Sequence, residues 1–236
     1  MAEHLGHFEA PSDHLLGTGS WPLCRLRGHD LETLLASSQH EFKQPFDPRF
    51  GKMMVKAASH VLSLPDIDGL YGFAEHGEVS LLVRRCTAER SARELLVRVV
   101  AEASAKLSVL LGAVATYDAV VYEFPNPQLV ENYYRWRQHE AVAQALDGYC
   151  THVLTRSGGE ADGMLKILDG LGVDEKLEIL RQNEIDYAEL PLWQRRGTGI
   201  IVRANGEGAD GVARLMVDTN LPEEEAYAAY LRPLFA

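Results

Sequence analysis

The chain has 236 residues, of which 46% are hydrophobic and 24% charged, and its formal net charge at pH 7 is −11. A chain of this size and composition can bury a substantial core as one large or two small domains. The acidic balance disfavours a general nucleic-acid binder, because nonspecific affinity for phosphate comes mainly from clustered Lys and Arg. Any site for RNA or a nucleotide must therefore be local.

No apolar run approaches the roughly twenty residues of a membrane span. The opening residues, Met1 to Leu5, lack the basic and apolar regions of a signal peptide. The three cysteines, Cys24, Cys86 and Cys150, are odd in number and widely spaced, which argues against a disulfide framework or a structural zinc site. These features predict a cytoplasmic protein that makes no membrane contact.

The first half of the chain alternates between strand and helix patterns. Residues 1–20 show no clear periodicity and predict an arm or loop. Strands are predicted over 21–27, 70–74, 78–84 and 117–124, and helices over 31–38, 50–62 and 90–111. The order strand, helix, strand, strand, helix, strand is that of a ferredoxin-like sheet, so we predict an α+β fold.

The second half is predicted to be mainly helical. Asn126 can cap a long helix that Pro127 begins and that ends at Gly158 and Gly159. Further helices are predicted over 160–171, 173–182 and 222–231, and strands over 198–204 and 212–217.

The long predicted helix contains an unusual motif at residues 133–138, Tyr-Tyr-Arg-Trp-Arg-Gln. Its rings, guanidinium groups and amide suit phosphates and bases, although helical aromatics also pack in cores and arginines also stay solvated. A second block follows, with Lys-Leu-Glu at 176–178, Ile-Asp-Tyr at 185–187 and Trp-Gln-Arg-Arg-Gly-Thr-Gly at 193–199. Together the two blocks resemble the tRNA-histidine guanylyltransferase family and its archaeal and bacterial 3′-to-5′ polymerase relatives.

The resemblance covers about residues 21–204. It implies a nucleotidyltransferase palm on the ferredoxin-like sheet with a C-terminal helical extension. It also implies GTP or ATP as ligand, Mg²⁺ as cofactor, a tRNA whose 5′ end receives a nucleotide, and a homo-oligomer, either dimer or tetramer. The expected regions, which form one integrated domain, are an N-terminal arm (1–20), the palm-like region (21–125), a helical region with a final strand (126–204) and a C-terminal tail (205–236).

Two sequence motifs of the palm-like region depart from the family pattern. Such a palm holds two Mg²⁺ ions roughly 4 Å apart on acidic side chains. The family motif Arg-x-Asp-Gly-Arg matches residues 25–29, where Arg27 occupies the aspartate position. The family motif Ser-Asp-Glu-hydrophobic-Ser matches residues 76–80, where Gly77 occupies the aspartate position. Glu78 alone remains as the catalytic and metal-ligating candidate. A guanidinium repels a metal ion and can itself pair with phosphate, so the two-metal site is expected to be degraded.

Other residues are candidates for the remaining roles. A shifted single-metal site would be formed by acids and histidines in or next to these two motifs, namely His29, Asp30, Glu75, His76 and Glu78. By resemblance, the candidates for nucleotide or phosphate binding are Arg25, Lys43, Arg49 and Lys176, and those for RNA binding are Arg135, Arg137 and Gln138. Structural ion pairs, with Asp47 and Glu178 as partners, explain these cations equally well.

Three functions therefore stay open from the sequence. The first is a working guanylyltransferase-like enzyme with nonstandard metal ligands. The second is a pseudoenzyme that binds a nucleotide or RNA without turnover. The third is a structural partner of an active relative.

Overall fold

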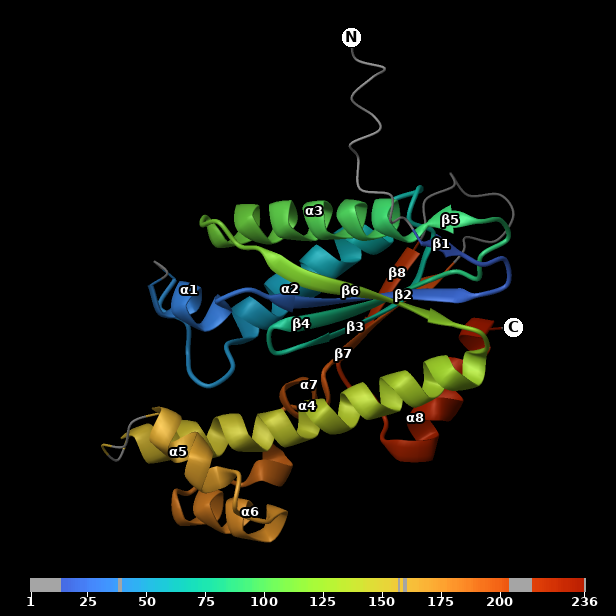
Figure 1. The fold of residues 1–236 in the computed structure, drawn as a ribbon. Helices are drawn as coiled ribbons and strands as arrows, with labels where there is room; N and C mark the ends of the chain where they lie inside the picture. The colour runs from blue at the N-terminus through green and yellow to red at the C-terminus, as the bar shows by residue number, and fades with distance from the viewer. Residues whose placement is uncertain (1–13, 38–39, 157, 159–160, 204–213, 236) are drawn as a thin grey trace.

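The computed structural model describes residues 14–37, 40–156, 158, 161–203 and 214–235. At its centre lies a six-stranded antiparallel sheet in the order β6-β2-β4-β3-β7-β8 (Figure 1). Its strands are β2 (Trp21–Gly28), β3 (Gly69–Glu75), β4 (Glu78–Val83), β6 (Tyr117–Phe124), β7 (Thr198–Arg203) and β8 (Arg214–Asp218). A separate pair joins β1 (Leu15–Leu16) to β5 (Arg90–Ser91).

The four strands of the first half confirm the predicted ferredoxin-like fold. In chain order these strands are β2, β3, β4 and β6, and in the sheet they lie as β6-β2-β4-β3, which is the order of that fold. Strands β7 and β8 come from the last quarter of the chain and extend the sheet beyond β3. The helical region between β6 and β7 is thereby tied back to the sheet at both of its ends.

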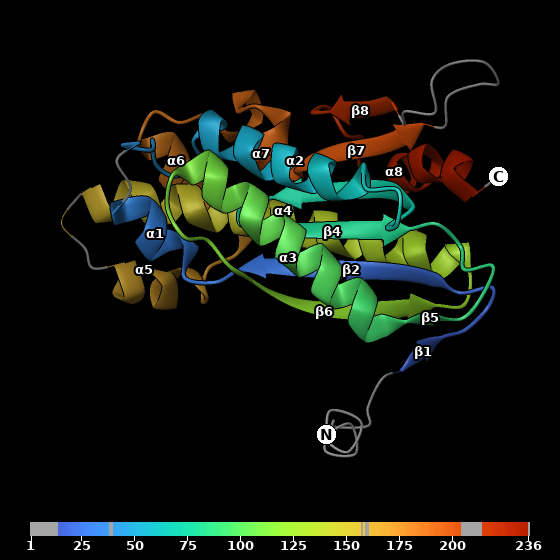
Figure 2. The ribbon, with the colours of Figure 1, turned by 90° about the horizontal axis from the view of Figure 1, so that it is seen from above.

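Helices cover both faces of this sheet. Helices α2 (Pro48–Leu62) and α3 (Ala92–Leu111) pack together on one face, and α4 (Pro127–Arg156) crosses the other (Figures 1 and 2). The shorter helices are α1 (Leu31–Ser37), α5 (Ala161–Leu168), α6 (Val173–Gln182), α7 (Leu192–Arg196) and α8 (Glu224–Leu231), with single turns η3 (Tyr187–Glu189) and η4 (Arg232–Phe235). None of the helices in the described part of the chain combines the length and the apolar character that crossing a membrane requires.

Alternation along the strands divides the core between the two faces. In β2, Cys24 and Leu26 join the apolar cluster beneath α2 and α3, whereas Leu23 joins the cluster beneath α4. The α4 face is rich in aromatic rings, and Tyr134 packs edge-on against Tyr71 at a centroid distance of 5.0 Å. Tyr133 and Tyr134 of α4 are therefore core residues, whereas Trp136 of the same helix is 43% exposed.

Helix α4 follows the predicted capping. The backbone N–H of Leu129 donates to Asn126 Oδ1 at 3.1 Å, and the helix continues to Arg156. Gly158 then takes the left-handed conformation with a φ of 99°. Gly159 lies outside the described residues.

Several predicted boundaries shift. Residues 14–20, expected as part of an arm, include strand β1, which pairs with Arg90 and Ser91 and so delays the start of α3 to Ala92. Ser91 then caps α3, because its Oγ accepts a hydrogen bond from Glu94 N at 2.9 Å. The closing helix begins at Glu224 instead of 222. Residues 1–13 and the predicted strand start at 212–213 lie outside the described residues.

Candidate functional site

A charged row crosses the α4 face of the sheet near one end of its strands. Arg27 of β2 pairs in register with Glu78 of β4, and Glu78 pairs in register with Glu75 of β3. These three residues are the charged row. The backbone N–H of Gly28 also donates to the Gly77 carbonyl at 2.9 Å. The two palm motifs, residues 25–29 and 76–80, therefore lie side by side in the sheet, although they are about fifty residues apart in sequence.

Three arginines surround the carboxylate of Glu78. Arg25 approaches its Oε2 with Nη2 at 2.7 Å and Nε at 2.8 Å. Arg137 of α4 places Nη2 2.9 Å from the same oxygen, and Arg27 places Nε 3.4 Å from Oε1. The negative charge of Glu78 is thus fully engaged by cations of the protein itself.

Arg137 also forms a buried pair with Glu75. The Arg137 side chain is 1% exposed, and its Nη2 donates to Glu75 Oε1. Burial raises the pKa of Glu75 to about 8, and the neighbouring guanidinium offsets only part of that rise. The ring of Trp136 lies against Arg137 and Arg25, with centroid distances of 5.1 and 5.5 Å. Helix α4 therefore fixes the inner part of the cluster in place.

A cavity of about 810 Å³ opens at this end of the sheet, beside α1. Its walls are the end of β2, the β3–β4 turn, the segment 42–47, the start of α2 and the second half of α4. Its charged lining residues are Arg27, Asp30, Lys43, Asp47, Glu75 and Glu78. A concave site of this volume with a few polar groups is of the size that small-molecule ligands, including nucleotides, occupy.

Asp47 organises the segment that carries Lys43. Its carboxylate accepts hydrogen bonds from the backbone N–H groups of Lys43 and Arg49, both at 2.7 Å, and pairs with the Arg49 guanidinium. The Arg49 hydrogen bond holds the pKa of Asp47 well below its usual range. Arg49 also donates to the Glu41 carbonyl at 2.9 Å and does not line the cavity. The Lys43 side chain is exposed, lines the cavity and makes no ion pair within the described part of the chain.

The cavity is also lined by residues that the motifs did not single out. One is Phe46, which stacks at a centroid distance of 4.3 Å on His76, a candidate for the shifted metal site whose pKa is lowered by burial. Helix α4 contributes polar or small residues at helical spacing, namely Gln144, Gly148, Thr151, His152 and Thr155. A search for small and polar residues recurring every three or four positions would have found this face.

The remaining predicted residues have structural partners away from the cavity. Lys176 Nζ lies 2.5 Å from Asp147 Oδ1. Arg135 Nη2 lies 3.3 Å from Glu224 Oε2, on helix α8. The structure thus brings Arg25, Arg27 and Glu78 together and leaves Lys176 and Arg135 apart from them.

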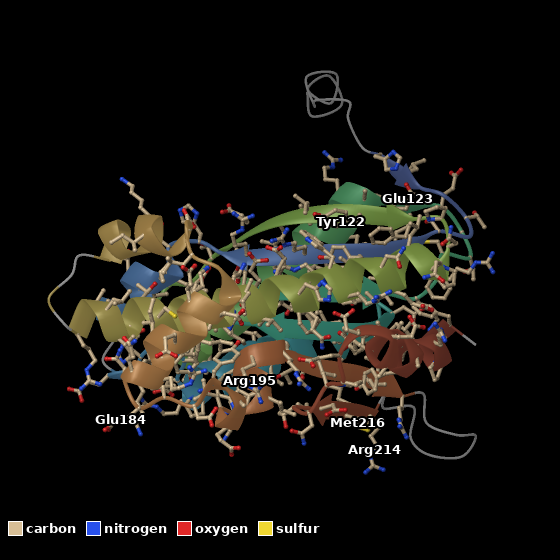
Figure 3. The ribbon with its side chains drawn as sticks, turned by 90° about the horizontal axis from the view of Figure 1, so that it is seen from below. Tyr122, Glu123, Glu184, Arg195, Arg214 and Met216 are labelled. Carbon is tan, nitrogen blue, oxygen red and sulfur yellow. The ribbon has the colours of Figure 1, made fainter. Side chains whose placement is uncertain are left out.

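Arg137 and Gln138, both predicted to contact RNA, are only 1% exposed. Gln138 Nε2 donates to the Pro222 carbonyl at 2.9 Å, so it joins α4 to the tail. Arg195, in the 193–199 motif, donates to the carbonyls of Leu190 and Ala188. Figure 3 shows Arg195 on the opposite side of α4 from Tyr122 and Glu123 of β6.

The shifted metal arrangement finds no support in this geometry. Within the described residues, no three His, Cys, Asp or Glu side chains form a group that could hold a metal ion. His29 instead lies 3.3 Å from Asp30 and 3.2 Å from Asp118, and these carboxylates raise its pKa.

The fold and this cavity define a ferredoxin-like α+β protein of the palm type, with a nucleotide-sized site at the end of its central strands. A sequence profile of the tRNA(His) guanylyltransferase family matches residues 2–128, more than half of the chain. This protein belongs to the tRNA(His) guanylyltransferase family.

Curated relatives agree with that assignment. The tRNA(His) guanylyltransferase 2 of Arabidopsis thaliana is 24% identical over 200 residues, which cover 80% of this chain and 37% of the relative. The tRNA(His) guanylyltransferase of Debaryomyces hansenii is 27% identical over 187 residues, which cover 71% of this chain and 68% of the relative. The chain therefore spans little more than a third of the length of the Arabidopsis relative.

Solved structures share the fold. A bacterial tRNA(His) guanylyltransferase-like protein in complex with ATP superposes with a TM-score of 0.79 at 16% identity, covering 100% of this chain and 98% of that one. A bacterial protein of the same description in complex with GTP gives a TM-score of 0.72 at 18% identity, with coverages of 99% and 98%. The Saccharomyces cerevisiae tRNA(His) guanylyltransferase gives 0.72 at 19% identity, with coverages of 84% and 91%.

Proposed function

We propose that this protein binds a nucleoside triphosphate in the cavity beside the charged row and has lost the two-metal nucleotidyl transfer of its family. The single observation that carries the proposal is the engagement of Glu78 by Arg25, Arg27 and Arg137. The function is therefore that of a nucleotide-binding family member, with catalysis replaced by recognition.

The cavity supports the binding half of the proposal. Its volume of about 810 Å³ and its two exposed cations, Arg27 and Lys43, suit a phosphorylated ligand. Phe42 and Phe46 supply apolar surface in the same cavity, against which a base can pack. The bacterial structures of the same fold were solved with ATP and GTP, which makes these two nucleotides the first ligands to test.

The donor set supports the other half, because it does not fit two magnesium ions. Mg²⁺ requires oxygen ligands that carry available negative charge. Position 27 supplies a guanidinium, position 77 has no side chain, and the oxygens of Glu78 already meet three cations. A metal ion there would have to displace at least one of those arginines against electrostatic repulsion.

Each group therefore has a role in binding instead of turnover. Arg25 and Arg137 hold Glu78 and Glu75 in place beneath α4. Asp47 fixes the backbone from which Lys43 reaches the cavity. The tRNA partner, the homo-oligomeric state and the cytoplasmic location remain predictions from the sequence.

One assay tests both halves. Purified protein is incubated with labelled GTP or ATP and a tRNA(His) transcript in Mg²⁺, a gel resolves extended 5′ ends, and a filter assay measures retained nucleotide. We expect retained nucleotide and no extended product. An extended product that disappears in the Glu78→Gln variant would demonstrate a working active site and overturn the loss of catalysis. No retained nucleotide would overturn the binding.

A further inference from the structure

We infer that Arg27 replaces the metal ion in this site, so that the triphosphate binds as the free anion through the Arg27 guanidinium and needs no divalent cation. The inference rests on the proposed function and specifies how the same site holds its ligand. It concerns the phosphate groups, whose recognition in a two-metal palm depends on Mg²⁺.

The arginine–carboxylate cluster at the end of the sheet has a net positive charge. Three guanidinium groups, from Arg25, Arg27 and Arg137, share two carboxylates, from Glu75 and Glu78. One net positive charge is left even when both carboxylates are ionised. Of the other acids that line the cavity, Asp47 is paired with Arg49, and the charge of Asp30 is offset by that of Lys43. A site of that sign attracts a polyphosphate directly and repels a divalent cation, which is the reverse of a site built from aspartates.

Arg27 is the most exposed of the three arginines. Its side chain is 66% exposed, compared with 16% for Arg25 and 1% for Arg137. Its single ion pair, at 3.4 Å, uses Nε, and its two terminal nitrogens make no hydrogen bond to any group in the described part of the chain. Arg27 can therefore present both terminal nitrogens to phosphate oxygens, while Arg25 and Arg137 still neutralise Glu78.

Lys43 supplies a second cation from a different wall of the same cavity. Its backbone is fixed by Asp47, whose own charge is taken up by Arg49, so Asp47 does not compete for the ammonium group. Two positive groups from independent elements therefore line one cavity. We expect a di- or triphosphate, which can extend toward both, to bind more tightly than a monophosphate.

Calorimetric titration of GTP into the full chain tests the inference. The titration is run once in excess EDTA and once in excess Mg²⁺. We expect the affinity in EDTA to be at least as high as the affinity in Mg²⁺, and in no case more than about threefold lower. An affinity that falls by more than this in EDTA would overturn the inference while leaving nucleotide binding, and so the proposed function, intact. No binding in either buffer would overturn both.

Variants then assign the effect to Arg27. Arg27→Ala should lower the GTP affinity in EDTA by roughly 10- to 100-fold, because it removes charge-assisted hydrogen bonds. The matched control is Arg84→Ala, which removes an exposed arginine of the same charge just beyond the other end of β4, outside the cavity. We expect this control to bind GTP like the wild type.

Two further readouts make the result decisive. Thermal unfolding checks that each variant is folded, and Arg27→Asp, which reverses the charge, should weaken binding in EDTA more than Arg27→Ala does. An Arg27→Ala variant that is folded and binds GTP as tightly as the wild type would show that Arg27 does not hold the phosphates, and would overturn the inference.

Discussion

One face of the sheet carries two kinds of chemistry on the same three strands. Toward one end of these strands, Leu23, Leu82 and Tyr71 pair side by side and pack beneath α4. Four residues further along each strand, toward its opposite end, the charged row takes the corresponding positions. Period-two alternation keeps both rows on one face, so the backbone is the same and only the side chains differ.

The difference teaches where this family member can change without unfolding. The apolar row is enclosed by α4 and α8 and contributes to the stability of the sheet. The charged row borders the cavity, where Arg27 is mainly exposed and Gly77 sits in a turn. A substitution at the exposed position of this end, Arg27, therefore alters binding at little cost to the fold.

The largest effect is expected in the apolar part of this face. Phe73 is fully buried and packs edge-on against Tyr134. Phe73→Ala should lower the free energy of unfolding by about 4 kcal/mol, since it removes buried area and leaves a cavity. Urea denaturation measures the loss. The control Val97→Ala, at an exposed position of α3, should change stability by no more than about 0.5 kcal/mol. Equal small losses would contradict the assignment of this face to the core.

The next effect separates the buried part of the charged cluster from its exposed part. Arg137→Met should cost about 3 kcal/mol of unfolding free energy at a pH above 8, where the buried Glu75 carboxyl of the wild type is ionised and would lose its cation. The cost should be smaller at a pH well below 8, where Glu75 is protonated in both proteins. Urea denaturation at the two pH values measures both numbers. A cost that does not depend on pH would show that the charge of Glu75 is not involved.

A further effect concerns the pH dependence of the wild type. The folded-state pKa of Glu75 is about 8, above its ordinary value of 4.5, so between these values the folded state binds more protons than the unfolded state. Stability should therefore fall as the pH rises from about 4.5 to about 8. The charged groups facing Glu75 are Arg137, Glu78 and Arg25. Glu75→Gln should remove this part of the slope, and an unchanged slope in that variant would assign it to other groups.

The smallest effect on stability is expected at Arg27. Among the residues that the structure describes, its exposed side chain has one ion-pair partner, at 3.4 Å, so Arg27→Ala should change the free energy of unfolding by less than about 0.5 kcal/mol. The same variant is expected to lose most of its GTP affinity. A large loss of stability here would erase the contrast between the two rows.

The sequence was sufficient for the fold because the strand and helix periodicities are regular. Strand 117–124 and helix 173–182 have the predicted limits, and the cap at Asn126 is confirmed. The β1–β5 pair was missed, because two-residue strands carry no periodic signal and their pairing joins segments about 75 residues apart.

The arginine cluster could not be predicted in the same way. Arg137 meets Glu78 across 59 residues of sequence, and that contact depends on how α4 is rotated over the sheet. Arg135 and Arg137 are two positions apart, roughly 200° around a helix, so they face opposite directions. The motif that contains them indicated the family. Only the packing of α4, however, buries Arg137 against the sheet and turns Arg135 toward α8.

The central claim is that the phosphates bind at Arg27 without a metal ion, and phosphorus NMR of GTP tests it most directly. In EDTA, addition of the wild-type protein should broaden or shift the phosphate signals, addition of Arg84→Ala should do the same, and addition of Arg27→Ala should have a much weaker effect. Signals that stay unchanged in EDTA and respond only after Mg²⁺ is added would contradict the claim.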